Sequence, residues 1–397
     1  MIVRAQPPGP ILKFPDFLTT QDFLRKHWQK QSLHIPGGIT RELPSLSPDE
    51  LGWLATLEDV ESRLVFTERS DGKTVYRVED GPFADKELQA LPTTNWTLLV
   101  QDVEKHLPDF RAYFDLTEFV PDWRIDDVMV SFATPGGSVG PHRDNYDVFL
   151  CQGAGTRTWH LAERDSVREA EGSGALRLLE EFGDQNPILA EAGDILYLPP
   201  GVPHWGISTT ACMTYSIGMR APTRDEIVTY LDNSAAPDAQ LNDNTYFCDP
   251  DLNLEEAVPG LISKQALERT RVLLGEGIQR TDSEIAAALG RTVTELKPWI
   301  TPAAFGHDEA NKILKTHGSE DGLTMHGMAR LAWFDASGDC QVFANGYCRN
   351  ISDTQTALIG DICAHRGLDR ERLQHAVKND ANVDLLRWCI QKGLFDV

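Results

Sequence analysis

The alternation of hydrophobic and polar positions over residues 124–221 predicts a series of short β-strands. In DDVMVSFATPGG, four residues share one face at a period of two: Asp127, Met129, Ser131 and Ala133. Further strands are expected in YDVFLCQGAGTRTWHLA, GDILYLPPGVPHWGI and CMTYSIGMRAP, with turns rich in glycine and proline between them. The GAG in the first of these is typical of a hairpin. Many short strands with such turns predict a barrel or a sandwich.

Helical patterns lie on both sides of these strands. Residues 15–60 read as helices around polar turns, with DFLRKHWQKQSLHIPGG prominent. After residue 221, TRDEIVTYLDN, SKQALERTRVLLGEGI and SEIAAALGRTVTELKPWI are helical, and we expect Gly290 and Pro298 to break the last of them. Near the C-terminus, strand-like GMARLAWFDASGDCQVFANGYCRNI precedes helical DTQTALIGDICAHRG and NVDLLRWCIQKGLF. That order resembles a small winged-helix unit.

A chain of 397 residues is too long for one ordinary core. We therefore expect an α+β protein in three parts. Residues 1–222 hold the strands and the N-terminal helices, residues 223–302 are helical, and residues 303–397 are winged-helix-like.

The net charge of −23 narrows the choice of partners. A broad, sequence-independent grip on nucleic acid needs lysine and arginine against phosphate, so this charge argues against direct binding of nucleic acid. It fits a basic partner drawn in by the field of an acidic surface. Solubility alone explains the charge equally well.

The seven cysteines form an odd set without a CxxC pair, which argues against a disulfide framework or a structural zinc site. The first residues, MIVRAQPPGPILKF, lack the continuous apolar core of a signal peptide. No window reaches the apolar length of a membrane helix. We expect a cytoplasmic protein that does not interact with membranes.

The segment PHRDNYDVF carries the first chemical signal. In an extended chain His142 and Asp144 point to the same side, so both can reach one metal ion, while Arg143 points away. The best third ligand is His204, which follows the rigid turn PPGVP. Two histidines and one carboxylate form the facial triad of non-haem iron(II) oxygenases. For either histidine alone, a turn cap or packing beside Trp205 is the better explanation, but the full arrangement favours the metal site.

Iron oxygenases of this kind commonly use 2-oxoglutarate, whose distal carboxylate needs a buried cation. Arg157 lies on the strand after the GAG turn, with Trp159 on the same face, and its guanidinium offers a bidentate fork. Without the metal motif, Arg157 would be read as an exposed arginine on a strand.

PDWRIDDVMVSFATPGGSVGPHRDNYDVFLCQGAGTRTWHL together with EAGDILYLPPGVPHWGIS resembles the JmjC-type ribosomal-protein oxygenases, in particular the bacterial arginine hydroxylases. The likeness is most specific over residues 120–222 and looser over the rest of the chain. It implies a double-stranded β-helix of the cupin type that uses iron(II), 2-oxoglutarate and O2. The expected substrate is an arginine in the sixteenth protein of the large ribosomal subunit.

Carried over by position, the resemblance places the iron ligands at His142, Asp144 and His204, and the cation for 2-oxoglutarate at Arg157. The chemistry is centred on iron and needs no separate acid or base. The resemblance also implies a homodimer formed through the helical region. The apolar residues available for this include Leu267, Leu273 and Leu274, which could equally be core.

One position departs from the family pattern. Relatives often carry a hydroxyl residue where this chain has Ala133, which cannot donate a hydrogen bond to 2-oxoglutarate. Ser131, Thr134 or Thr214 could compensate, and Thr214 stands where relatives can have asparagine. The affinity for the co-substrate therefore depends mainly on Arg157.

A guanidinium entering the barrel requires a carboxylate and an aromatic or soft apolar wall. Asp127, Met129 and Tyr146 are the candidates, because they alternate onto the face that also carries Asp144. Asp126 falls on the opposite face. Core packing of Met129 and Tyr146, with a solvated Asp127, is the plainer alternative.

Two rival functions remain at this point. One is a JmjC hydroxylase or demethylase acting on a histidine or lysine of another basic protein, because Asp127 favours a cation without separating arginine from lysine. The other is a non-catalytic, cupin-like regulatory protein whose winged helix binds nucleic acid. The complete triad with Arg157 argues against that second rival.

Overall fold

The computed structural model describes residues 11–70, 73–170, 177–183, 186–231, 245–275, 277–303, 305–317, 322–336, 338 and 340–396. The chain divides into two compact units. One comprises Met1–Glu118 with Asp126–Met219, and the other Phe119–Ile125 with Arg220–Val397. Among the described residues, no helix has both the length and the apolar character needed to cross a membrane.

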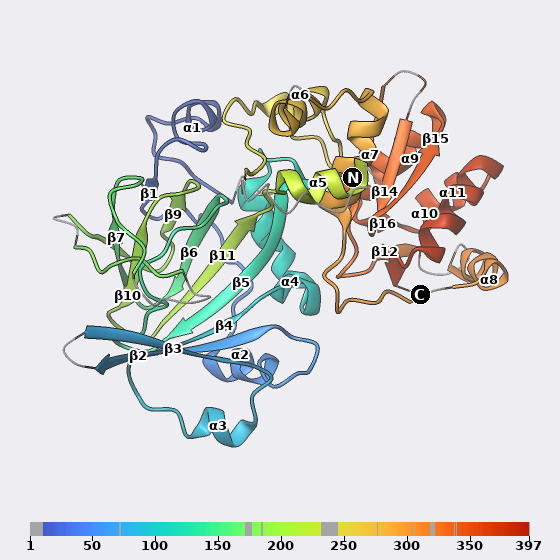
Figure 1. Ribbon diagram of the computed structural model, residues 1–397. Helices are drawn as coiled ribbons and strands as arrows, with labels where there is room; N and C mark the ends of the chain where they lie inside the picture. Colours follow the sequence, from blue (N-terminus) through green and yellow to red (C-terminus); the bar gives the residue numbers. More distant parts are fainter. Residues whose placement is uncertain are drawn as a thin grey trace, which may run out of the picture. The chain divides into compact units, whose positions relative to one another are not determined.

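Two β-sheets build the first unit (Figure 1). The larger sheet has eight strands in the order β1 (Leu33–Ile35), β9 (Ile195–Leu198), β6 (Val148–Ala154), β11 (Cys212–Met219), β5 (Ile125–Ala133), β4 (Trp96–Val100), β2 (Ser62–Ser70) and β3 (Lys73–Asp80). The smaller sheet has the order β10 (His204–Ser208), β7 (Arg157–Leu161) and β8 (Ile188–Ala190). β6 pairs antiparallel with both β9 and β11, and β7 pairs antiparallel with both β8 and β10.

A hydrophobic core joins the two sheets. It includes Val148 and Leu150 from β6, Leu196 from β9, Trp159 from β7 and Ala190 from β8, all buried. Side chains from two inner faces that share one core define a sandwich. The predicted class of strand-rich fold is thus confirmed, with all the strands anticipated between residues 124 and 221 present.

The hairpin expected at GAG is wrong. β6 lies in the larger sheet and β7 in the smaller one, so the intervening turn carries the chain from one sheet to the other. Gly155 has a φ of +62°, and a Cβ there would lie 2.0 Å from the Ala211 carbonyl oxygen. Glycine is required because the backbones approach too closely for a side chain, which a hairpin and a crossing turn can demand alike.

Helices accompany the strands of the first unit: α1 (Thr20–Lys26), α2 (Pro48–Leu54), α3 (Asp85–Gln89), α4 (Val103–His106) and the 3₁₀ segment η1 (Pro108–Thr117). The Thr19 hydroxyl accepts a hydrogen bond from the Asp22 N–H at the start of α1. Ser47 and Glu50 form a capping box at the start of α2. These side chains satisfy backbone donors that a helix N-terminus leaves unpaired.

In the second unit, η2 (Asp122–Arg124), α5 (Arg224–Leu231), η4 (Leu254–Glu256), α6 (Lys264–Leu274) and α7 (Asp282–Thr294) accompany the sheet β13 (Leu331–Phe334), β14 (Cys340–Ala344) and β15 (Tyr347–Ile351). The break expected at Gly290 does not occur, because α7 runs through it to Thr294. A Cβ at Gly290 would lie 2.3 Å from the Phe343 ring. This glycine lets the helix pack closely on β14 and does not end it.

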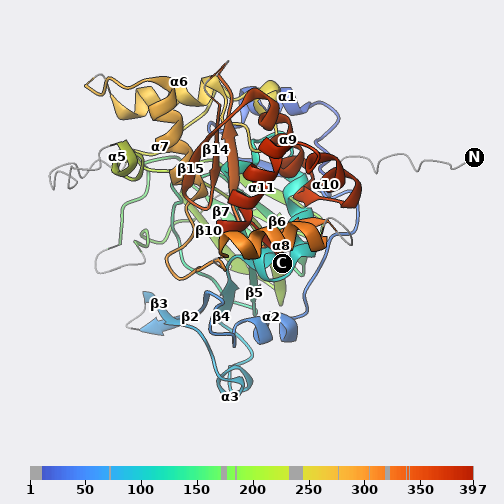
Figure 2. The same cartoon turned by 90° about the vertical axis from the view of Figure 1, so that its right-hand side faces the viewer.

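The C-terminal part of the second unit comprises α8 (His307–His317), β12 (Leu323–Met325), α9 (Asp353–His365), β16 (Gly367–Leu368), α10 (Arg370–Ala376), α11 (Asp380–Gln391) and β17 (Phe395–Asp396). Figure 2 shows α8, α9, α10 and α11 gathered together. They share one core that includes Leu314, Ile359, Leu373 and Leu386. β12 is the central strand of a small sheet between β16 and β17.

Candidate metal centre and substrate pocket

His142 and Asp144 lie in the segment between β5 and β6, and His204 is the first residue of β10. The backbone N–H of His142 donates to the His204 carbonyl at 3.0 Å, and the N–H of His204 donates to the His142 carbonyl at 2.9 Å. A further hydrogen bond, from the Gly201 N–H to the Asp144 carbonyl at 2.8 Å, ties in the PPGVP turn. The backbone itself therefore holds the two segments together.

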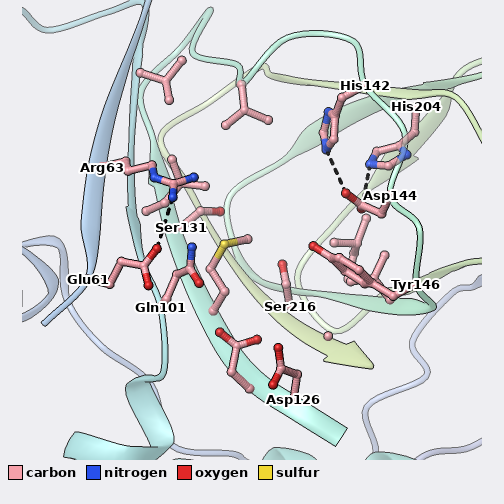
Figure 3. A pocket seen from close by; sticks show the side chains of 18 of the residues that line it. Glu61, Arg63, Gln101, Asp126, Ser131, His142, Asp144, Tyr146, His204 and Ser216 are labelled. Carbon is pink, nitrogen blue, oxygen red and sulfur yellow. Dashed lines mark hydrogen bonds and ion pairs between the residues drawn. The ribbon is translucent and has the colours of Figure 1, made fainter. Parts of the chain in front are cut away.

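The three side chains converge on one point (Figure 3). Nε2 of His142 lies 3.9 Å from one Asp144 oxygen, and Nε2 of His204 lies 3.5 Å from the other. One potential ligand atom from each residue lies within 4.8 Å of the others, and no second group of three such residues gathers in the part of the chain that the structure describes. This spacing fits one metal ion bound by three protein ligands on one face.

Contacts behind the imidazoles orient them. Nδ1 of His142 lies 2.9 Å from the Gly140 carbonyl, and Nδ1 of His204 lies 2.9 Å from the Val202 carbonyl. Since a carbonyl only accepts, each Nδ1 carries the proton and each Nε2 presents a lone pair to the point where the three side chains converge. Burial, together with the neighbouring His142, lowers the pKa of His204 to about 4. The neutral, ligating form is thereby favoured.

The position of Arg157 on β7 bears on whether the cavity can bind 2-oxoglutarate. Arg157 lines the same cavity as the three ligands and is only 5% exposed. Among the described residues, none offers a hydrogen-bond partner to its Nε or Nη2. Buried guanidinium donors without partners cost free energy, so these two fit the distal carboxylate of 2-oxoglutarate. Trp159 packs against it, with the Arg157 Cζ 5.6 Å from the ring centroid.

The other residues anticipated near the co-substrate separate into two groups. Ser131 lines the cavity, whereas Ala133 and Thr214 are buried and do not. The Thr214 hydroxyl donates to Gln152 Oε1 at 3.2 Å. Arg143 points away as expected, because its Nη2 donates to the Val167 carbonyl at 2.6 Å.

The three expected substrate residues, Asp127, Met129 and Tyr146, line the cavity, which encloses about 450 Å³. Asp127 is buried, while Tyr146 is 40% exposed. The burial of Asp127, with the neighbouring Asp126 and Asp102 carboxyls, raises the pKa of Asp127 to about 8.

Several lining residues were not anticipated: Glu61, Arg63, Gln101, Asp126 and Ser216 (Figure 3). The first three come from β2, β4 and the residues next to them, a stretch for which no strands were predicted. Asp126 faces the cavity despite its place on the opposite side of the alternation. It is the second residue of β5, two residues after the end of the 3₁₀ turn η2.

Two sheets packed face to face, with a two-histidine, one-aspartate cluster and a buried arginine in one cavity, define a JmjC/cupin-type oxygenase. A model of the JmjC domain family matches residues 114–227. The ribosomal protein uL16 3-hydroxylase of Escherichia coli (strain K12) is 38% identical over 265 residues, which is 67% of this chain and 69% of the relative. A probable ribosomal oxygenase of Haemophilus influenzae (strain ATCC 51907 / DSM 11121 / KW20 / Rd) is 35% identical over 274 residues, covering 67% and 63%.

Solved structures agree over nearly the whole chain. The Escherichia coli ribosomal oxygenase YcfD in complex with cobalt and 2-oxoglutarate superposes with a TM-score of 0.69 at 30% identity, covering 96% of this chain and 98% of that one. An X-ray structure of the same protein gives a TM-score of 0.72. The chain belongs to the JmjC-domain ribosomal oxygenases. It is a 2-oxoglutarate-dependent oxygenase, and its cofactors are iron(II), 2-oxoglutarate and O2.

Proposed function

We propose that this chain hydroxylates an arginine side chain of uL16, the sixteenth protein of the large ribosomal subunit. The observation that carries the proposal is the buried Asp127 carboxylate, which lines the same cavity as the three candidate metal ligands. A carboxylate at that place suits a cationic side chain brought to an oxidising metal. The name of the Escherichia coli relative, a uL16 3-hydroxylase, supports uL16 as the substrate and position 3 of the target residue as the site of hydroxylation.

Each side chain has a defined task in this proposal. His142, Asp144 and His204 hold iron(II), and Arg157, with help from Ser131, holds the distal carboxylate of 2-oxoglutarate. When bound, iron(II) and 2-oxoglutarate use O2 to put one oxygen atom into a substrate C–H bond and the other into succinate, with release of CO2. The chain contributes binding, orientation and exclusion of water, and no residue serves as a separate acid or base.

Asp127 binds the guanidinium of the target arginine, and Met129 and Tyr146 flank it. A planar guanidinium suits both a carboxylate and an aromatic or thioether wall, whereas a lysine ammonium is a compact and strongly hydrated charge. Arginine is therefore preferred over the alternatives, lysine and histidine.

We assign residues 1–222 to the oxygenase domain, 223–302 to a helical dimerisation region and 303–397 to a winged-helix-like domain. Leu267 and Leu274 are buried within the second unit, so they are core, and Leu273 packs against that core. Val272 on α6 is 83% exposed and is the better candidate for a homodimer contact. The C-terminal domain serves protein contacts, and the enzyme acts in the cytoplasm, where ribosomal proteins are made.

The direct test uses the full-length purified protein, iron(II), 2-oxoglutarate and recombinant uL16. We expect succinate to form in step with the addition of one oxygen atom to a single arginine, located by tandem mass spectrometry. Oxygen on a histidine would favour a histidyl hydroxylase, and loss of methyl groups from a methylated lysine would favour a demethylase. Either result, or succinate formation that uL16 does not stimulate, would contradict the proposal.

A further inference from the structure

A buried turn lies directly behind the proposed guanidinium site. Asp102, Glu104 and Lys105, at the start of α4, have side chains that are at most 6% exposed. The backbone N–H of Asp102 donates to Asp127 Oδ2 at 3.2 Å. The substrate-facing carboxylate of β5 is thus held by the turn that opens α4.

An ion pair closes this turn. The Lys105 ammonium donates to Asp102 Oδ1, and the Lys105 N–H donates to the Asp102 carbonyl at 2.9 Å. Asp102 has a φ of +56°, in the left-handed region that aspartate adopts only at some cost. Nζ of Lys105 also lies 3.9 Å from Glu104, whose other oxygen accepts the Val128 N–H at 2.8 Å. The strained turn is therefore hydrogen-bonded to β5 at two successive residues, Asp127 and Val128.

The charges in this cluster do not balance. Among the described residues, three buried carboxyls, Asp102, Glu104 and Asp127, outnumber two cations, the Lys105 ammonium and the Arg111 guanidinium that acts on Glu104. A buried excess of negative charge is costly, which favours the protonated form of a carboxyl in this cluster. Burial raises the pKa of Glu104, and burial with the neighbouring carboxyls raises that of Asp127, while Lys105 acts in the opposite direction on both.

Other charged groups lie around Asp127. Asp126, next to it on β5, adds a carboxyl, and Arg111 of η1 acts on Glu104. β11 meets the Asp127 carboxyl at Gly218, which has no ionisable side chain. Glu61 and Arg63, an ion pair at 3.1 Å, line the same cavity.

We propose that the Asp102–Lys105 ion pair is a positioning element for Asp127, which sets the pocket's affinity for a cationic side chain by fixing the carboxylate and offsetting its negative neighbours. The inference rests on the proposed function and deepens it. The incoming guanidinium takes the place of a proton held by the cluster. Lys105 is a positioning residue, because it acts through Asp127.

Lys105→Met tests this positioning role, because methionine keeps most of the length and loses the charge. At pH 7 we expect the KM for uL16 to rise roughly tenfold, the change in ionised fraction that one pKa unit produces below the pKa. The kcat and the KM for 2-oxoglutarate should change less than about twofold, because the metal end is untouched. Lys105→Arg should restore most of the affinity. Lys86→Met on α3, an exposed lysine, is the matched control.

The pH profile separates positioning from mere structural support. In the parent protein the KM for uL16 should fall as the pH rises through about 8, where Asp127 ionises. Lys105→Met should move that fall to higher pH. A parallel loss of kcat and of both KM values, or an unshifted profile, would overturn the positioning role.

A measurement without uL16 keeps the two proposals distinguishable and does not depend on the Lys105 variants folding. Asp127 has a raised pKa in the folded protein, so its stabilising contribution is complete below the ordinary aspartate pKa and is lost as the pH rises through about 8. The free energy of unfolding of Asp127→Asn should therefore fall less between pH 5 and 8 than that of the parent protein. Both are measured at intervals of about one pH unit. If the two proteins had the same pH dependence, the pKa of Asp127 would not be raised. The proposed positioning role would then be wrong, whatever the result with uL16.

Discussion

The two ends of the cavity hold aspartates of opposite character. At the metal end, Asp144 stands between two imidazoles whose Nδ1 atoms are fixed by backbone carbonyls. At the substrate end, Asp127 is buried among other carboxyls, and its pKa is raised to about 8. We propose that the same type of side chain binds a metal in the first setting and a cationic substrate in the second. Environment, and not residue type, assigns the role.

The first way to break this comparison is to remove a ligand from the metal end. His204→Ala should reduce uL16-dependent succinate formation by more than about a hundredfold, since losing even a partner of a ligand commonly costs ten- to a hundredfold. The rate is measured with saturating iron(II) and 2-oxoglutarate. His365→Ala on α9, a half-exposed histidine in the other unit, is the control and should keep full activity. Full turnover by His204→Ala would contradict the assignment of His204 as a metal ligand.

The metal end could be predicted from sequence because each of the two segments that build it is a short motif. His142 and Asp144 are two residues apart, and the PPGVP turn presents His204 within a short motif. The substrate end was only half predicted. β5 supplies Asp127 and Met129, but Glu61, Arg63 and Gln101 arrive through strands paired across the sheet. Which strands become neighbours is a property of the whole fold, and no short motif encodes it.

The errors at glycines have the same origin. GAG and Gly290 were read as local turn and break signals. Each is explained by a neighbour distant in sequence, Ala211 in one case and Phe343 in the other. A glycine shows that space is short but not which segment occupies it.

The second test removes Arg157, the cation proposed to bind the distal carboxylate of 2-oxoglutarate. Arg157→Ala should raise the KM for 2-oxoglutarate about a hundredfold, because hydrogen bonds to a charged group contribute about 1.5–3 kcal/mol. Initial rates of succinate release against 2-oxoglutarate concentration give the value. Arg157→Lys keeps the positive charge but loses the bidentate geometry of the guanidinium. Its KM for 2-oxoglutarate should lie between those of the parent protein and Arg157→Ala. An unchanged KM in Arg157→Ala would mean that another residue holds the distal carboxylate.

The third test addresses the substrate end alone. Asp127→Asn should raise the KM for uL16 about ten- to a hundredfold, the order of a lost charge-assisted contact, and leave the slow turnover of 2-oxoglutarate without uL16 unchanged. Asp126→Asn is the matched comparison, because it also lines the cavity but is less buried. Equal effects of the two variants would show that the pocket reads general negative charge and not one carboxylate.

The smallest effect expected distinguishes the two hydroxyls of Ser131 and Thr214, which the sequence placed near the co-substrate. Ser131→Ala should raise the KM for 2-oxoglutarate about tenfold, since one hydrogen bond to a charged group contributes about 1.5 kcal/mol at the low end of its range. Thr214→Val should leave it unchanged, because the Thr214 hydroxyl contacts Gln152 outside the cavity lining. Thermal unfolding of both variants controls for stability. The reverse order of effects would place the co-substrate closer to β11 than we propose.

The most direct test of the account is the mass of uL16 from cells that contain or lack this protein. Tandem mass spectrometry of the uL16 peptides should find one arginine that carries an additional oxygen atom in the parent cells. The deletion should remove that oxygen, and reintroducing the parent chain, but not Asp127→Asn at the same level, should restore it. An arginine that stays modified after deletion, or uL16 without added oxygen in the parent cells, would contradict the account.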